Sequence, residues 1–219
     1  MDLMELAKVV MSHAKGSDAM AREMTQRALD DGHAAEVILD QGLIEGMRDV
    51  GVRFRDNLIF VPEVLISAKA MHAGLAVLEP ILTECGIEPL GKMVIGTVKG
   101  DIHDIGKNLV GMMMKGAGIE VVDLGVNTSL DKFCAAIEQH RPNILGMSAL
   151  LTTTMIQMGK NIATFKEKGY VDAGMRIMVG GAPITQEYAD RIGAHAWGKD
   201  ASDAVAKAKS LIESKATAA

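Results

Sequence analysis

Asp101 and His103 are the two residues of this 219-residue chain whose types and spacing most directly suggest chemistry. They lie two positions apart in residues 99–108, between a short apolar run and a helical pattern. On an extended loop, side chains two apart can point the same way, so the carboxylate can hold one ring nitrogen of the histidine. The other ring nitrogen is then free to bind a metal, as is usual for metal-bound histidines. Taken alone, the pair fits equally well a loop histidine near an acidic helix start.

The number of nearby ligands limits the kind of metal site. A zinc or two-metal hydrolase needs three or more ligands, of which Asp101, His103 and Asp104 could supply some. The other five histidines do not cluster with His103 in the sequence. A site with one histidine instead suggests a metal that arrives with most of its ligands in place, which means a macrocycle.

The same stretch does not fit a phosphate-binding loop. Five residues, not four, separate Gly100 from Gly106, and Asn108 stands where such a loop has its magnesium-binding hydroxyl. The chain also contains no Gly-x-Gly-x-x-Gly motif. We therefore exclude nucleoside triphosphates and dinucleotides as ligands.

Small and hydroxylated residues follow two further apolar runs, in residues 146–154 and 180–183. Either stretch alone could be a strand-to-helix turn. Together they predict a narrow channel along a sheet edge, with room for a long ligand tail.

The elements that must position these residues fall into two predicted domains. Residues 1–84 show four amphipathic helical patterns, typical of a small antiparallel bundle. Gly16 is expected to end the first helix, Ser17 to cap the second, and Pro62 to lie in the first turn of the fourth. Residues 85–92, with two glycines and a proline, are predicted to be a linker.

Residues 93–219 alternate short apolar runs with helical patterns, which indicates a doubly wound (Rossmann/flavodoxin-like) α/β domain with a five-stranded parallel sheet. The expected strands are 93–98, 121–124, 144–147, 177–179 and, more weakly, 195–197. The expected helices are 106–117, 129–140, 154–168, 185–192 and 201–214. Thr128 and Asp131 are expected to form a capping box. In such a sheet the ligand lies beyond the carboxyl ends of the strands, where the motifs fall.

Composition excludes several classes of partner. The net charge of −5 and the 3% aromatic content argue against nucleic-acid binding. Cys85 and Cys134 are too far apart in the sequence for a cysteine-rich zinc site, and two cysteines fit a reducing cytoplasm. Charges among the first residues argue against a signal peptide, and the lack of an uncharged apolar run of about 18 residues argues against a membrane span.

The motifs together resemble the cobalamin-binding signature. Its parts occur here in order: Asp101-x-His103-x-x-Gly106, Ser148-x-Leu150, and Gly180-Gly181. Residues 42–54 and 60–64 resemble the helical cap of the methyl-carrying group. That group includes the cobalamin module of methionine synthase and the small corrinoid proteins of methanogens and acetogens. The resemblance covers nearly the whole chain.

The resemblance implies a role for each matching residue. His103 would be the lower axial ligand of cobalt, Asp101 would hydrogen-bond His103, and Thr154 would hold Asp101. Ser148 and Thr152 would contact the nucleotide tail, with Leu150 in the same motif. Further cofactor contacts would come from residues of the other matching segments: Gly100, Ile102, Asp104, Gly106, Gly180, Gly181 and Ala201. On the cap, Phe54 would shield the upper face of the corrin, and Val61 stands where methionine synthases have leucine.

The implied protein is a methyl carrier that cycles between methylcob(III)alamin and cob(I)alamin and is not catalytic alone. A substrate-specific methyltransferase would load the methyl group from a methylamine, betaine, methanol or methoxyaromatic donor. A second methyltransferase would pass it to tetrahydrofolate or coenzyme M, and a reductive activase would rescue oxidised cobalt. The alternatives are a cobalamin-dependent sensor, a divalent-metal hydrolase and an adenosylcobalamin mutase subunit.

Overall fold

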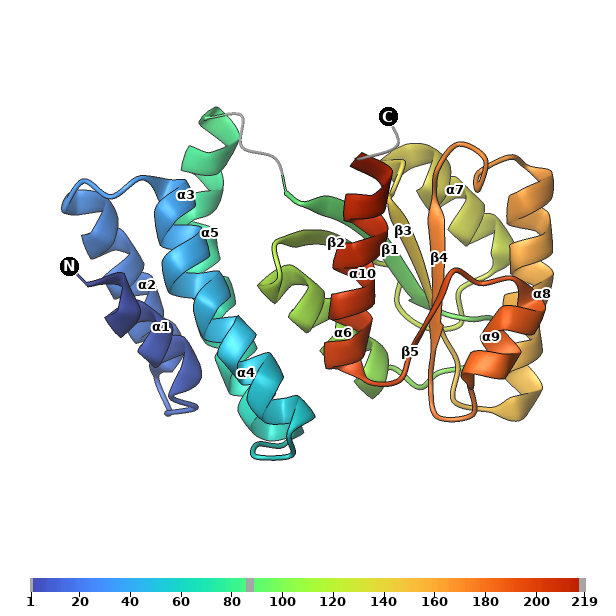
Figure 1. Cartoon of the computed structure of the whole chain (residues 1–219), viewed down its shortest axis with the longest axis horizontal. Helices are drawn as coiled ribbons and strands as arrows, with labels where there is room; N and C mark the ends of the chain where they lie inside the picture. Colours follow the sequence, from blue (N-terminus) through green and yellow to red (C-terminus); the bar gives the residue numbers. More distant parts are fainter. Residues whose placement is uncertain (1, 86–88, 217–219) are drawn as a thin grey trace. The chain divides into compact units, whose positions relative to one another are not determined.

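The computed structural model describes residues 2–85 and 89–216 (Figure 1). The chain forms two compact units. One ends at residue 89 and takes in residues 115–118, and the other comprises residues 90–114 and continues from residue 119. The linker predicted at 85–92 falls partly on residues 86–88, which lie outside the described residues.

The first unit is helical, which confirms the predicted fold class of this part. Its elements are α1 (Leu3–Met11), α2 (Ser17–Asp30), α3 (Ala35–Ile38), the π-helical segment η1 (Leu39–Ile44), α4 (Glu45–Arg55) and α5 (Val61–Glu84). Ile38 and Ile44, at the two junctions of η1, keep right-handed helical dihedrals, so α3, η1 and α4 form one continuous rod. The four predicted helices are therefore α1, α2, this rod and α5.

Two predicted N-caps are wrong, each by one residue, and α1 ends at Met11, with Ser12 as its C-cap, and not at the predicted Gly16. Gly16, not Ser17, is the N-cap of α2, with a φ of 89° that favours glycine, and Ser17 is the buried first residue of the helix. Ser129, not Thr128, caps α7, and its hydroxyl accepts a hydrogen bond from the Lys132 amide. Thr128 instead extends the sheet, because it forms a parallel bridge to Val98.

The rod passes very close to α1 because it carries glycines at the crossing. A Cβ atom on Gly46 would lie 2.9 Å from the carbonyl oxygen of Ala7 and 2.8 Å from the Cβ of Val10. Ala7 and Val10 are fully buried. The spacing of the two helices thus depends on the missing side chain at this position.

Helix α5 is long and apolar enough to cross a membrane by length and composition, over Val61–Leu82 with a mean hydropathy of 1.4. Charged residues such as Lys69 interrupt the apolar run, so the sequence predicts no membrane span here. In the structure, α5 buries one row of apolar residues in the bundle, including Val64, Met71 and Leu78. The length and hydropathy of α5 are therefore also those of a helix packed in the core of a bundle.

The second unit holds a parallel sheet, as predicted. The strands are β1 (Gly91–Thr97), β2 (Ile119–Asp123), β3 (Ile144–Ser148), β4 (Arg176–Gly180) and β5 (Ala196–Gly198). The helices between and after them are α6 (Ile105–Gly116), α7 (Leu130–His140), α8 (Thr152–Glu167), α9 (Gln186–Ile192) and α10 (Ala201–Ala216). Each begins and ends within two residues of its expected position.

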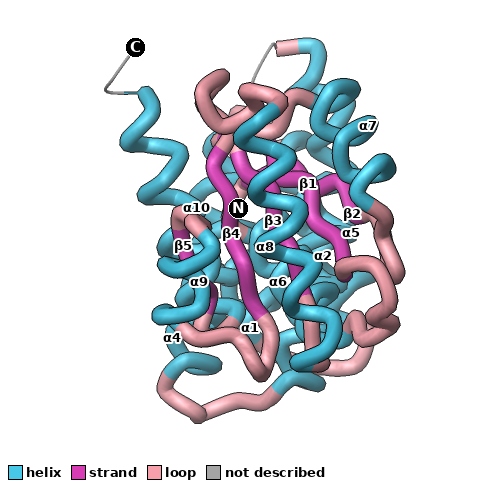
Figure 2. The backbone as a smooth tube through the Cα atoms, turned by 90° about the vertical axis from the view of Figure 1, so that its right-hand side faces the viewer, coloured by secondary structure: helices cyan, strands magenta, loops and turns pink. Residues whose placement is uncertain are grey.

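The strand order is β2-β1-β3-β4-β5, so the chain changes direction across the sheet between β1 and β3. Helices α6 and α10 cover one face through residues such as Met114 and Ala208. Helices α7, α8 and α9 cover the other face, around Phe133 and Phe165 (Figure 1). Figure 2 looks onto this second face. Doubly wound sheets bind ligands at the carboxyl ends of the two strands on either side of this change of direction, which are β1 and β3 here.

We expect Gly46→Ala to destabilise the helical unit by about 1–3 kcal/mol, because the new methyl group meets the backbone of α1 and must push it away. The gain in helix propensity, about 1 kcal/mol, offsets only part of this cost. Urea unfolding followed by circular dichroism measures the change. Gly111→Ala in α6 is the matched control, since its Cβ would lie at an ordinary 3.7 Å from Val121. A Gly46→Ala protein as stable as the control would contradict the tight crossing.

Candidate functional site

A single buried carboxylate, that of Asp101, organises the loop after β1. Its side chain is fully buried and accepts five hydrogen bonds. Oδ1 accepts from the backbone amide of His103 at 3.0 Å and lies 2.7 Å from its ring Nδ1. Oδ2 accepts from the amides of Leu150 and Leu151, at 2.8 and 3.3 Å, and from the Thr154 hydroxyl at 2.6 Å. The carboxylate therefore joins the end of β1 to the start of α8, across the switch point of the sheet.

This environment keeps Asp101 ionised. Burial raises the pKa of a carboxyl, but here the hydrogen bonds from Thr154, His103 and Leu150 outweigh it, and the pKa of Asp101 lies well below its usual range. An ionised Asp101 accepts from every donor around it. Ring atom Nδ1 of His103 must then carry the proton of that hydrogen bond, so that in the neutral imidazole the free electron pair lies on Nε2.

The His103 side chain is 45% exposed to solvent, whereas the side chain of its partner Asp101 is fully buried. Large apolar residues near His103 are exposed as well: Ile102 on its loop at 72% and Ile105 at the start of α6 at 77%. Leu150 and Leu151, in the turn before α8, are also exposed. Exposed apolar side chains gathered around a polar group are typical of a ligand-binding surface. The ligand that fits here is a large, mostly apolar group that takes one nitrogen from the protein.

Asn127, which was not predicted from the sequence, fixes the backbone of the loop that carries the Asp101–His103 pair. This loop, residues 100–104, is called the motif loop below. Its side-chain oxygen accepts from the Gly100 amide at 2.8 Å, and its backbone amide donates to the Asp101 carbonyl at 2.9 Å. Its φ of 50° is left-handed, a conformation that asparagine tolerates better than most residues. On the other side, the Thr97 hydroxyl donates to the His103 carbonyl. The sequence signal was an asparagine in a short turn between Gly125 and a helix.

A row of small residues crosses the sheet beside His103. Thr97 pairs with Ser148, Ser148 with Gly180, and Gly180 with Gly198. Alternation along the strands puts all four on the face covered by α6 and α10, and a Cβ on Gly198 would meet Ala204 of α10. The row lies at the carboxyl ends of the strands. The sequence predicts a narrow channel at Ser148 and Gly180, and the strand register places Thr97 and Gly198 in the same row.

Other predicted tail contacts surround this row. Gly181 has a φ of 128°, and a Cβ there would lie 1.9 Å from the Ala149 carbonyl oxygen, so only glycine fits. Ser148 is half-buried and Thr152 exposed, and neither hydroxyl bonds to a described residue. Ala201 is buried at the start of α10. The hydroxyls are thus available to a ligand.

Four further predicted residues make no hydrogen bond to the Asp101 side chain. Asp104 is half-buried and its carboxylate accepts from Asn108, while Gly106 is exposed on the first turn of α6. Phe54 and Val61 are half-buried residues of the helical unit, on α4 and α5. The three-ligand metal site considered for a hydrolase does not form, since the described residues contain no group of three His, Cys, Asp or Glu placed to hold a metal.

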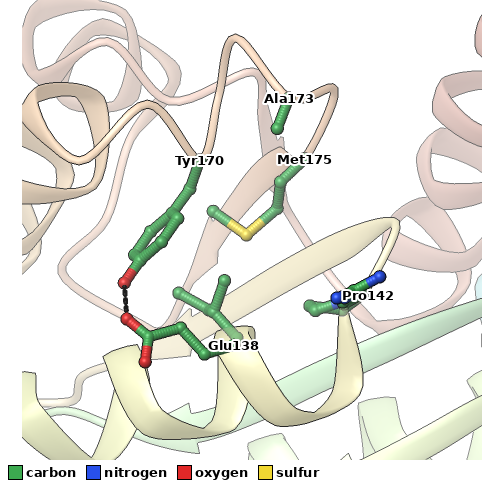
Figure 3. Close-up of a pocket in the computed structure, with 7 residues that line it drawn as sticks. Glu138, Pro142, Tyr170, Ala173 and Met175 are labelled. Atoms are coloured by element: carbon green, nitrogen blue, oxygen red, sulfur yellow. Dashed lines mark hydrogen bonds between the residues drawn. The ribbon is translucent and has the colours of Figure 1, made fainter.

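A separate cavity of about 460 Å³ lies at the opposite, amino-terminal edge of the sheet (Figure 3). Pro142 and Met175, which precede β3 and β4, line it with Tyr170, whose hydroxyl bonds to the Glu138 carboxylate. This bond holds the loop after α8 against α7 and raises the pKa of Tyr170. The sequence analysis singled out none of these residues, and the cavity does not adjoin His103.

We expect Thr154→Val, which keeps the shape of the side chain, to destabilise the protein at pH 7 by about 1–3 kcal/mol through loss of a donor to a buried carboxylate. The folded-state pKa of Asp101 should rise towards its usual value. Because the lowered pKa stabilises the fold only above the usual carboxyl pKa, near ~3.9, the deficit should shrink as the pH falls below it.

Urea unfolding between pH 3 and pH 7, with a ¹³C titration of the Asp101 carboxyl, measures both effects. Thr153→Val is the control, since Thr153 is exposed and bonds to no described residue. A deficit independent of pH would show that the Thr154 hydroxyl does not act through Asp101.

Comparison with known proteins identifies the family of the chain. Residues 91–206 match a B12 binding domain, and residues 6–79 match a second B12 binding domain model. A corrinoid protein of Desulfitobacterium hafniense (strain Y51) is 41% identical over 200 residues, which cover 90% of this chain and 92% of that protein. Trimethylamine corrinoid protein 2 of Methanosarcina acetivorans is 40% identical over 211 residues, 95% of this chain and 97% of that one.

Among solved structures, the methanol:cobalamin methyltransferase complex of Methanosarcina barkeri contains a chain with the same fold. The TM-score is 0.85 at 27% identity, and the match covers 96% of this chain and 79% of that one. The two B12 binding domain matches and the relatives aligned along almost their whole length show the family. The chain belongs to the B12-binding corrinoid proteins and binds a corrinoid.

Proposed function

We propose that this protein carries a methyl group on the cobalt of a bound corrinoid, between two methyltransferases, and does not catalyse the transfers alone. The observation that carries this proposal is the exposed His103 ring, fixed at Nδ1 by a buried carboxylate and surrounded by exposed apolar residues. A macrocycle brings its other metal ligands with it, so one imidazole nitrogen from the protein is enough.

The residues fit a corrinoid in three respects. Nε2 of His103 would ligate the cobalt, the exposed isoleucines and leucines would cover the ring, and the row Thr97–Ser148–Gly180–Gly198 would admit the nucleotide tail. Bound cobalt supplies the centre that accepts and releases the methyl group. The free hydroxyls of Ser148 and Thr152 can bond to the tail.

The protein's own part in the transfer is to hold the histidine. Asp101 keeps the Nδ1 proton of His103 in place, and Thr154 with the Leu150 amide keeps Asp101 ionised. The imidazole therefore keeps one tautomer and one orientation whether or not Nε2 ligates the metal. Phe54 and Val61 of the helical unit would shield the methyl face.

The partners we propose are a substrate-specific methyltransferase, a second one acting on tetrahydrofolate or coenzyme M, and a reductive activase. The similarity to a trimethylamine corrinoid protein and to a methanol:cobalamin methyltransferase complex supports the first of these. The donor would be a methylamine, betaine, methanol or methoxyaromatic compound, chosen in the partner's active site. We propose that the protein and these partners act in the cytoplasm.

We expect His103→Ala to keep some corrinoid but to lose the absorption spectrum of histidine-ligated cobalt, since an alanine side chain offers the metal no nitrogen. The measurement is a visible spectrum of purified protein after reconstitution with hydroxocobalamin. His140→Ala, at the end of α7 away from the motif loop, is the control and should match the wild type. Retained corrinoid with an identical spectrum in His103→Ala would refute the axial role, and no retained corrinoid in the wild type would refute the function.

We expect Ser148→Leu to lower the affinity for cobalamin at least tenfold, because the larger side chain fills the row that admits the tail. The affinity for cobinamide, which lacks the nucleotide tail, should change less than twofold. Equilibrium titration followed by absorbance gives both values. An equal loss for the two corrinoids would mean that Ser148 does not line the tail channel.

A further inference from the structure

Lys107 is a buried lysine beside the motif loop that the proposed function leaves unexplained. It is the third residue of α6, and 1% of its side chain is exposed. Its ammonium donates to Oδ2 of Asp123, at the end of β2, and to Oδ1 of Asn108 at 2.6 Å. Burying an ammonium without partners is costly, so these two contacts fix where Lys107 can lie.

Asn108 holds the second end of the motif loop. Its side-chain amide donates to the Asp104 carboxylate at 3.1 Å, and its backbone amide donates to the Asp104 carbonyl at 2.7 Å. His103 directly precedes Asp104. The residue that bonds to Lys107 therefore sets the position of the chain immediately after the histidine.

Asp123 supports the other end of the same loop, before His103, through the turn that follows β2. Its Oδ1 accepts from the Gly125 amide at 2.8 Å and shapes the turn that contains Asn127. Asn127 in turn bonds to the backbone of Gly100 and Asp101. The carboxylate on the other side of Lys107 therefore supports the clamp on the chain before the histidine.

We propose that Lys107 is a positioning residue for His103, because its ammonium ties together the two asparagine clamps at the ends of loop 100–104. It touches neither His103 nor Asp101 and acts only through Asn108 and Asp123. This proposal rests on the corrinoid function above for its consequence, which is a histidine held in the geometry that ligates cobalt. Lys107 and Asn108 lie in the stretch that was compared with a phosphate-binding loop in the sequence, and their role in this proposal is to position the histidine.

The test compares Lys107→Met with Lys92→Met. Methionine matches the length of the lysine stem without its donors, and Asp123 is 44% exposed, so water can solvate the carboxylate that loses its partner. Lys92 is the control because it also forms an ion pair with a carboxylate of β2, that of Glu120, near the opposite end of that strand. Asp123→Asn, at an exposed position, tests the same link if Lys107→Met does not fold.

Two readouts are needed. In the protein without corrinoid, hydrogen exchange should speed up at least tenfold for amides of residues 100–108 and 124–128 in Lys107→Met, with no change in Lys92→Met. With hydroxocobalamin bound, Lys107→Met should retain the corrinoid but show at least a threefold lower ratio of histidine-ligated to unligated cobalt.

Exchange rates and spectra equal to those of Lys92→Met would overturn the proposal, as would faster exchange without any change in ligation. Failure of the corrinoid function itself is recognised separately, because the wild type would then retain no corrinoid. The exchange experiment would in that case still decide whether Lys107 joins the two clamps, and unchanged exchange would refute it.

Discussion

The buried carboxylate of Asp101 is the constraint on which the rest of the site depends. Removing a charge from water is costly unless hydrogen bonds replace the lost hydration, and here five donors do so. Those donors come from the loop after β1 and from the first residues of α8 and the turn before it. One side chain therefore fixes the histidine, the loop that carries it and the start of a helix that begins about fifty residues later.

The parallel sheet makes this convergence possible. Because β1 and β3 are neighbours at the switch point, the residues after them meet although they are far apart in the chain. The same register aligns Thr97, Ser148, Gly180 and Gly198, so that a row free of bulky side chains lies beside the loop that carries His103. A corrinoid needs both features, one for its metal and one for its tail.

The site combines rigid support with an exposed binding surface. Asp101, Thr154 and Lys107 are buried, whereas His103 and the isoleucines beside it are exposed. Hydrogen bonds of buried groups persist because water does not compete for them. A ligand can therefore cover the exposed residues without rearranging the groups that orient the histidine, which suits the carrier role that we propose.

The sequence by itself determined the two-part organisation, the five strands within two residues, and the Asp101–His103 pair, because hydrophobic periodicity and local spacing record these directly. It could not find Asn127, Gly198 or the link from Lys107 to Asp123, since each depends on which strands are neighbours. Two N-caps predicted from the sequence are also wrong. Thr128 pairs with Val98 in the sheet and so does not cap α7, and the cap position of α2 has a left-handed backbone that favours Gly16 over Ser17. Tertiary structure decided these features because sheet order and register bring distant residues together, and the local sequence does not encode that order.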